Sequence, residues 1–172
     1  NLQSEGFDAT ICFAEQHKDP DIVLRRIMQS HRALCASPEY LEKHGTPTCF
    51  DDLAKHNCLR IAGNSRRNKW NNSDVTNGQV FEARGTFEGN STDVIFHATL
   101  AGIGIARLPR YMTDAKFRSG ELVHVLPEYS PPSTDIAVMF PERRNLAPKT
   151  RVFVDFLVRH FRVAPERTKA SA

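Results

Sequence analysis

The stretch NSTDVIFHATLAGIGIARLPRYMTDAK, residues 90–116, decides the fold class. Asn90 has an acidic residue three positions further on, the spacing of a capping box, which predicts a helix that opens here and ends at Gly102. Residues 103–106 then form a short apolar strand, and a second helix starts at Pro109. The first helix is expected to bury the apolar positions on one face, namely Val94, Ala98 and Ala101. A helix, a strand and a helix in such close succession predict an α/β protein.

The rest of the chain continues this alternation. Ser37 can cap a helix whose first position is Pro38, and Gly45 ends that helix. Gly102 and Gly104 are expected to let their helix and strand pack closely. Further strands are expected over residues 7–14, 23–27, 33–36, 58–62, 79–87, 121–126 and 136–140, and further helices over residues 51–54, 109–116 and 148–163. The whole pattern favours a largely parallel sheet.

Two apolar segments are expected to be buried. Residues 7–14 form a nearly continuous apolar run, which is typical of a strand covered on both faces of a parallel sheet. The last helix repeats apolar residues at helical spacing and is expected to bury the stripe formed by Val152, Phe153, Phe156, Leu157 and Phe161.

Composition excludes several classes of protein. The chain has 172 residues, of which 40% are hydrophobic and 25% charged, as in an ordinary globular domain. Its longest unbroken apolar run, Leu100 to Ala106, is far shorter than the roughly 20 residues that a membrane-spanning helix needs. The net charge of +3 is mild and lacks the clustered basic face of a nucleic-acid-binding domain. The short cluster of Arg66, Arg67 and Lys69 is expected to lie in a solvated loop, with anion contact as the alternative.

The sequence shows no recognisable arrangement of catalytic residues. The four cysteines form no CxxC pair and are expected to be reduced, structural thiols in a cytoplasmic protein. His44, Cys49, His56 and Cys58 could be written as a zinc site, but their spacing matches no common template, so no metal is expected. Gly102 and Gly104 follow a helix, whereas a dinucleotide loop follows a strand. We therefore expect a binding module without a cofactor, not an enzyme.

Ligand contacts are expected where strands end and helices begin, because free backbone N–H groups gather there. The best candidates are Asn90 and Ser91 at a helix start. The other candidates are strand-end loops, formed by Gly63, Asn64 and Ser65 and by Ala14 and Glu15. Simple capping at residues 90–91 and an ordinary turn at residues 63–65 are the structural alternatives.

Several motifs, in order, resemble the effector-binding domain of LysR-type transcriptional regulators. Ala101–Pro109 is similar to the AGLGIALLP segment of that family. The other similar segments are Gly6–Ile11, Leu34–Leu41, His44–Pro47, Asp52–Leu59, Ser119–Val123 and Pro148–Phe161. Each motif is weak alone, but together they cover residues 6–163 in the family's order.

The resemblance implies a two-lobed fold like that of type II periplasmic binding proteins, with a small-molecule effector between the lobes. Residues 1–26 and 127–172 would form lobe I, and residues 27–126 would form lobe II, with the proline-rich stretch 127–132 as a crossing. The winged helix-turn-helix that reads DNA and a first βαβ unit of lobe I are expected upstream of Asn1. The resemblance carries the effector role onto Asn90 and Ser91, onto Gly63–Ser65, and more loosely onto Ala14 and Glu15.

The expected partners are an effector whose charge is open, DNA through the upstream head, and further copies in a homodimer or homotetramer. A periplasmic-type solute-binding protein of the same fold is the main alternative. A stand-alone sensing subunit and an enzyme are the other two alternatives.

Overall fold

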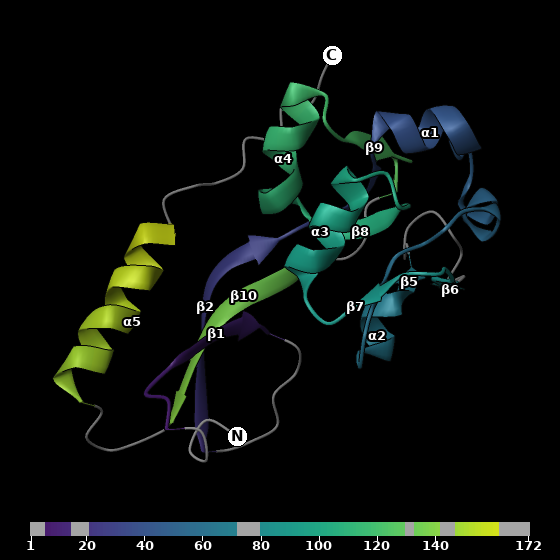
Figure 1. Cartoon of the computed structure of the whole chain (residues 1–172). Helices are drawn as coiled ribbons and strands as arrows, with labels where there is room; N and C mark the ends of the chain where they lie inside the picture. The colour runs from purple at the N-terminus through teal and green to yellow at the C-terminus, as the bar shows by residue number, and fades with distance from the viewer. Residues whose placement is uncertain (1–5, 15–20, 72–79, 130–132, 142–146, 162–172) are drawn as a thin grey trace. The chain divides into compact units, whose positions relative to one another are not determined.

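The computed structural model describes residues 6–14, 21–71, 80–129, 133–141 and 147–161, which fold into two compact units (Figure 1). Residues up to Ser30 and from Thr134 form unit 1, and residues 31–133 form unit 2. The divisions between the two units follow Ser30 and Ser133. Strand β2 runs through residue 26 and still pairs with its neighbour at Ser30.

The described residues of unit 1 form a three-stranded antiparallel sheet and one helix. The sheet has the order β1 (Thr10–Phe13), β10 (Thr134–Pro141), β2 (Ile22–Ser30). Strand β10 pairs with both neighbours, joining segments from opposite ends of the chain. Helix α5 (Pro148–Phe161) contributes Val154 and Leu157 to a core shared with Ile27, Val138 and Phe140.

The burial predicted for α5 is wrong except at Leu157. Val152, Phe153, Phe156 and Phe161 are 68%, 47%, 58% and 41% exposed, whereas Val154, Leu157 and Val158 are buried. This helix carries apolar residues on two adjacent faces, and their spacing suits burial of either one. Contact with the sheet selects the face that contains Val154.

Unit 2 contains a second antiparallel sheet, ordered β8 (Ala106–Pro109), β3 (Arg32–Ala36), β9 (Val123–Val125). Two smaller pairs join β4 (Arg60–Ile61) with β7 (Glu88–Gly89) and β5 (Lys69–Asn71) with β6 (Val80–Glu82). The helices of this unit are α1 (Pro38–His44), the 3-10 helix η1 (Phe50–Lys55), α2 (Ser65–Asn68), α3 (Thr92–Leu100) and α4 (Arg110–Ser119).

The core of unit 2 is built around strand β3, in which residues 33–36 are fully buried. Leu34 faces a cluster that includes Leu53, Ile105 and the tryptophan Trp70, whereas Cys35 faces a second cluster with Ile95. Successive residues of a strand point to opposite faces, so β3 separates two apolar layers. Trp70 is 1% exposed and therefore reports on the packing of this unit.

The expectation of a largely parallel sheet is wrong for the described residues. Five of the six described strand pairs are antiparallel, and only β4–β7 is parallel. A separate isolated bridge between Cys58 and Ile105 is also parallel. An apolar run predicts burial but does not encode the direction of the neighbouring strand. Strand β1 shows this, because it lies at a sheet edge and leaves Ile11 53% exposed.

The observed helix termini agree more closely with those predicted from the sequence. In α1, the Ser37 hydroxyl accepts the Tyr40 N–H at 3.2 Å and Gly45 follows the last helical residue, as predicted. Helix α3 is capped by Ser91, one residue later than the predicted Asn90. It buries Ile95, Ala98 and Thr99, whereas the predicted Val94 is 42% exposed.

Candidate functional site

The only described parallel strand pair brings two of the predicted loops together. Strands β4 and β7 run side by side, and the Ala62 N–H donates to the Gly89 oxygen at 2.8 Å just beyond them. Residues 63–65 leave β4 and lead into α2, and residues 90–91 leave β7 and lead into α3. Both loops therefore lie at the carboxyl ends of neighbouring parallel strands, where ligands of open α/β sheets bind.

Polar side chains cap both helices at this edge. The Asn64 side-chain oxygen accepts the Arg67 N–H at 3.1 Å, and the Ser91 hydroxyl accepts the Val94 N–H at 3.2 Å. The capping alternative is thus realised at residues 90–91, and Asn64 caps α2 where an ordinary turn was the alternative. Capping occupies one acceptor in each case, while the Asn64 amide group and the Ser91 hydroxyl hydrogen remain chemically able to donate. Asn90 is exposed, and Gly63 has φ of 69°, a conformation that favours glycine.

Arg67 links the two loops. Its guanidinium Nη1 donates to the hydroxyl of Thr92, the first residue of α3, at 3.4 Å. Arg66 and Lys69 are exposed, as expected, but Arg66 lies on α2 and Lys69 on β5, not in a loop, and Arg67 is half-buried. The sequence drew attention to this basic cluster without showing which of its members points toward α3.

Arg107 is a second cation of this region, and the site prediction missed it. It lies on strand β8 and donates from Nη2 to the backbone oxygen of Arg67 at 2.9 Å. Burial lowers the pKa of Arg107, the Tyr129 hydroxyl counteracts that shift, and Arg67 lowers the pKa further. An arginine inside the apolar segment 103–109 is the sequence signal that could have singled it out.

Ala14 and Glu15 cannot be joined to this site from the structure. Ala14 belongs to unit 1, where its N–H donates to the Asp135 oxygen at 2.7 Å. Glu15 lies outside the described residues. Their effector role stays a prediction.

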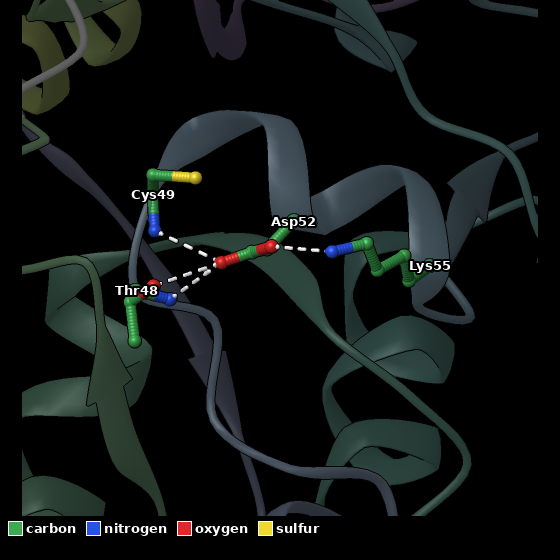
Figure 2. Close-up of polar contacts among 4 residues, drawn as sticks. All are labelled: Thr48, Cys49, Asp52 and Lys55. Carbon is green, nitrogen blue, oxygen red and sulfur yellow. Dashed lines mark hydrogen bonds and ion pairs between the residues drawn. The ribbon is translucent and has the colours of Figure 1, made fainter.

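A separate polar cluster surrounds Asp52 at the start of η1 (Figure 2). One carboxylate oxygen accepts from the Thr48 N–H and hydroxyl at 3.1 and 3.0 Å and from the Cys49 N–H at 3.3 Å. The other oxygen accepts from Lys55 at 2.9 Å. These contacts, led by the Lys55 hydrogen bond, hold the pKa of Asp52 well below its usual range. The arrangement is that of a helix cap, and we assign it a structural role.

The cysteines differ in their surroundings. All four thiols are free; Cys35 and Cys58 are buried, Cys12 is half-buried and Cys49 is exposed. Burial raises the pKa of Cys35 and raises that of Cys58 to about 12, which makes both thiols unreactive in the folded protein. The described part of the chain contains no group of three or more histidine, cysteine or acidic side chains arranged to hold a metal ion. Within the same ranges, no helix combines the length and apolarity needed to cross a membrane.

Comparisons with known proteins give a consistent family. Residues 1–162 match the model of the LysR substrate binding domain. An uncharacterized HTH-type transcriptional regulator of Haemophilus influenzae is 34% identical over 146 residues, which are 85% of this chain and 50% of the relative. The HTH-type transcriptional regulator DmlR of Escherichia coli is 30% identical over 162 residues, 94% of this chain and 52% of the relative.

Solved structures agree with these relatives. The regulatory domain of CrgA, a LysR-type transcriptional regulator from Neisseria meningitidis, superposes with a TM-score of 0.85 at 28% identity, covering 94% of this chain and 78% of that one. The chain spans about half the length of the curated relatives it matches. The similarity therefore concerns one domain of these regulators.

Proposed function

Because this chain belongs to the LysR substrate-binding domain family and has its two-lobed, periplasmic-binding-protein type II-like fold, we propose that it senses a small-molecule effector for a DNA-binding regulator. The observation that carries this proposal is the meeting of two helix starts at the ends of β4 and β7, linked by Arg67. The regulator relatives favour this function over a periplasmic-type solute-binding protein.

The wider protein is part of the same proposal. Units 1 and 2 would correspond to lobes I and II, and DNA would be bound by a winged helix-turn-helix outside this chain. A homodimer or homotetramer in the cytoplasm would bring such heads together. Effector binding would act by favouring the lobe arrangement that binds it more tightly, since a ligand shifts a conformational equilibrium only through its differential affinity.

The described side of the site favours an effector that carries a negative charge. The N-terminus of α3 contributes partial positive charge, and Arg67 and Arg107 contribute two full charges within one hydrogen-bonded chain. A carboxylate or phosphate group can accept from backbone N–H groups and from a guanidinium at once. Glu15 of the other predicted loop would oppose this preference if it faced the effector.

The proposal is tested by ligand binding to purified protein, screening small organic acids, matched neutral amides and organic amines for a shift in melting temperature and a change in Trp70 emission. Asn90→Leu with Ser91→Leu should abolish the response, because leucine removes both polar groups and obstructs the helix start. Ser119→Leu, an exposed polar-to-leucine change on α4, is the matched control and should keep the response. An unchanged response in the double variant would refute the assigned site.

A further inference from the structure

Two histidines flank one buried tyrosine in unit 2, away from the candidate site. Tyr40 is 2% exposed and lies in α1. The His44 ring stacks on it with centroids 4.4 Å apart, and the His56 ring lies 5.8 Å from it at a tilt. The Tyr40 hydroxyl is 3.2 Å from His56 Nδ1 and 2.9 Å from the backbone nitrogen of Asn57.

These contacts favour a neutral His56. A backbone N–H can only donate, so the Tyr40 oxygen accepts the hydrogen of Asn57. The Tyr40 hydroxyl can then donate its own hydrogen to His56 Nδ1 when that nitrogen is unprotonated. This contact requires a neutral His56 ring with its hydrogen on Nε2. If Nδ1 also became protonated, the tyrosine hydroxyl would lose its acceptor in a buried environment, which is costly.

His44 behaves differently. Its Nδ1 lies 3.0 Å from the backbone oxygen of Tyr40, which can only accept, so Nδ1 carries a hydrogen whether His44 is neutral or charged. The contact of His44 therefore uses a hydrogen on Nδ1, whereas the contact of His56 with the Tyr40 hydroxyl needs Nδ1 without one.

The charged groups around His56 come from two elements. Burial of the ring lowers the pKa of His56, the neighbouring His44 on α1 lowers it further, Asp52 on η1 raises it and Lys55 on η1 lowers it. Asp52 is itself bonded to Lys55 and to the Thr48 and Cys49 backbone, so its charge is largely compensated.

Asn57 extends the tyrosine contact to two further segments of unit 2. Its side-chain oxygen accepts the Thr86 N–H at 2.8 Å, and its side-chain nitrogen donates to the Ile103 oxygen at 2.7 Å. Its backbone oxygen accepts the Ile105 N–H at 2.9 Å. Asn57 therefore joins α1 to the segments on either side of the strand that leads to residues 63–65.

We propose that the Tyr40–His56–Asn57 contact is a pH-sensitive clamp, which holds α1 on the segment that leads into β4 while His56 is neutral and opens when His56 is protonated. The clamp does not depend on the effector, so its failure and that of the proposed function are separable.

The test measures pH-dependent unfolding of the 172-residue chain by Trp70 emission in urea, together with the titration of each histidine by NMR. In the wild type, His56 should titrate below its ordinary value of 6.5. The unfolded chain then binds more protons than the folded chain as the pH falls through 6.5, so acidification destabilises the fold. The unfolding equilibrium constant should rise about tenfold for each unit by which the measured pKa is depressed.

His56→Asn supplies an amide oxygen in place of Nδ1 and cannot titrate. The variant should therefore lack the loss of stability that protonation of His56 causes in the wild type between pH 7.5 and 5. His97→Asn, which removes an exposed histidine of α3, should retain it. Half-buried His124 contributes to the loss in every variant and cancels in the comparison.

A variant that retains the tyrosine ring gives a second test. Tyr40→Phe removes the hydroxyl that needs an acceptor and should raise the measured His56 pKa. The proposal is overturned if His56 of the wild type titrates at or above 6.5, or if Tyr40→Phe leaves its pKa unchanged. It is equally overturned if folded His56→Asn keeps the full pH dependence.

Discussion

Replacing Gly104 with alanine tests the closest backbone approach in unit 2. A Cβ atom at this position would collide with the backbone oxygen of Asn57 and would lie 2.9 Å from the Leu59 side chain. Gly104 does not have a positive φ, so alanine suits the local backbone and the whole effect is steric. The Asn57 oxygen is held by the Ile105 N–H, so it has little freedom to move aside.

The cost follows from the contacts that must be broken. Separating the two segments removes hydrogen bonds from Ile105 N–H to Asn57, from Leu59 N–H to Ile105 and from the Asn57 side chain to Ile103. At about 1 kcal/mol each, their loss amounts to about 3 kcal/mol, at the upper end of overpacking effects. With an m value of about 2 kcal/mol/M, the urea midpoint should fall by about 1.5 M.

Urea unfolding followed by Trp70 emission measures this directly, because Trp70 is buried in the same unit. Gly120→Ala is the matched control. Its φ of 76° disfavours alanine, but open space surrounds the position, so it should cost only about 1 kcal/mol. The reasoning is refuted if Gly104→Ala costs no more than Gly120→Ala.

Three further predictions concern caps and thiols. Ser91→Ala should lower the free energy of unfolding by about 1 kcal/mol through loss of the α3 cap, measured by urea unfolding, and no loss would argue against the hydrogen bond to Val94. Asp52→Asn should reduce stability at pH 7 and flatten the dependence of stability on acid pH. A carboxyl group with a lowered pKa stabilises the fold above its unfolded pKa near 3.8, and this stabilisation is lost as the pH falls toward the folded pKa. Thermal melts of the variant that match those of the wild type from pH 7 to 3 would contradict the assignment. In a thiol assay with Ellman's reagent, Cys49 should react before unfolding and Cys35 and Cys58 only after it; rapid reaction of all thiols would show that the core is open.

The sequence predicted the elements whose signals are local. Ser37, Pro38 and Gly45 marked α1 because a capping hydroxyl, a fixed φ and a helix stop act within a few residues. The sequence-based prediction failed where the position of an element depends on the segments that it contacts. The capping residue of α3 was misplaced by one position because Asn90 and Ser91 are both good caps, and only the entry of the chain from β7 selects Ser91.

The candidate site likewise combines residues that local sequence signals identified and residues that only tertiary contacts bring together. The loops at residues 63–65 and 90–91 could be named from the sequence, since each follows an apolar strand and precedes a helix start. Arg67 and Arg107 could not be placed there, because 40 positions separate them along the chain and only folding brings the Arg107 guanidinium to the Arg67 oxygen.

The sequence by itself determined the α/β class, the order of most elements and the family resemblance, because periodicity, caps and short motifs are properties of neighbouring residues. Tertiary structure alone decided strand direction, the buried face of α5 and the joining of α1, Thr86 and Ile103 at Asn57. These features are contacts between distant segments, and their energies depend on which surface each segment meets.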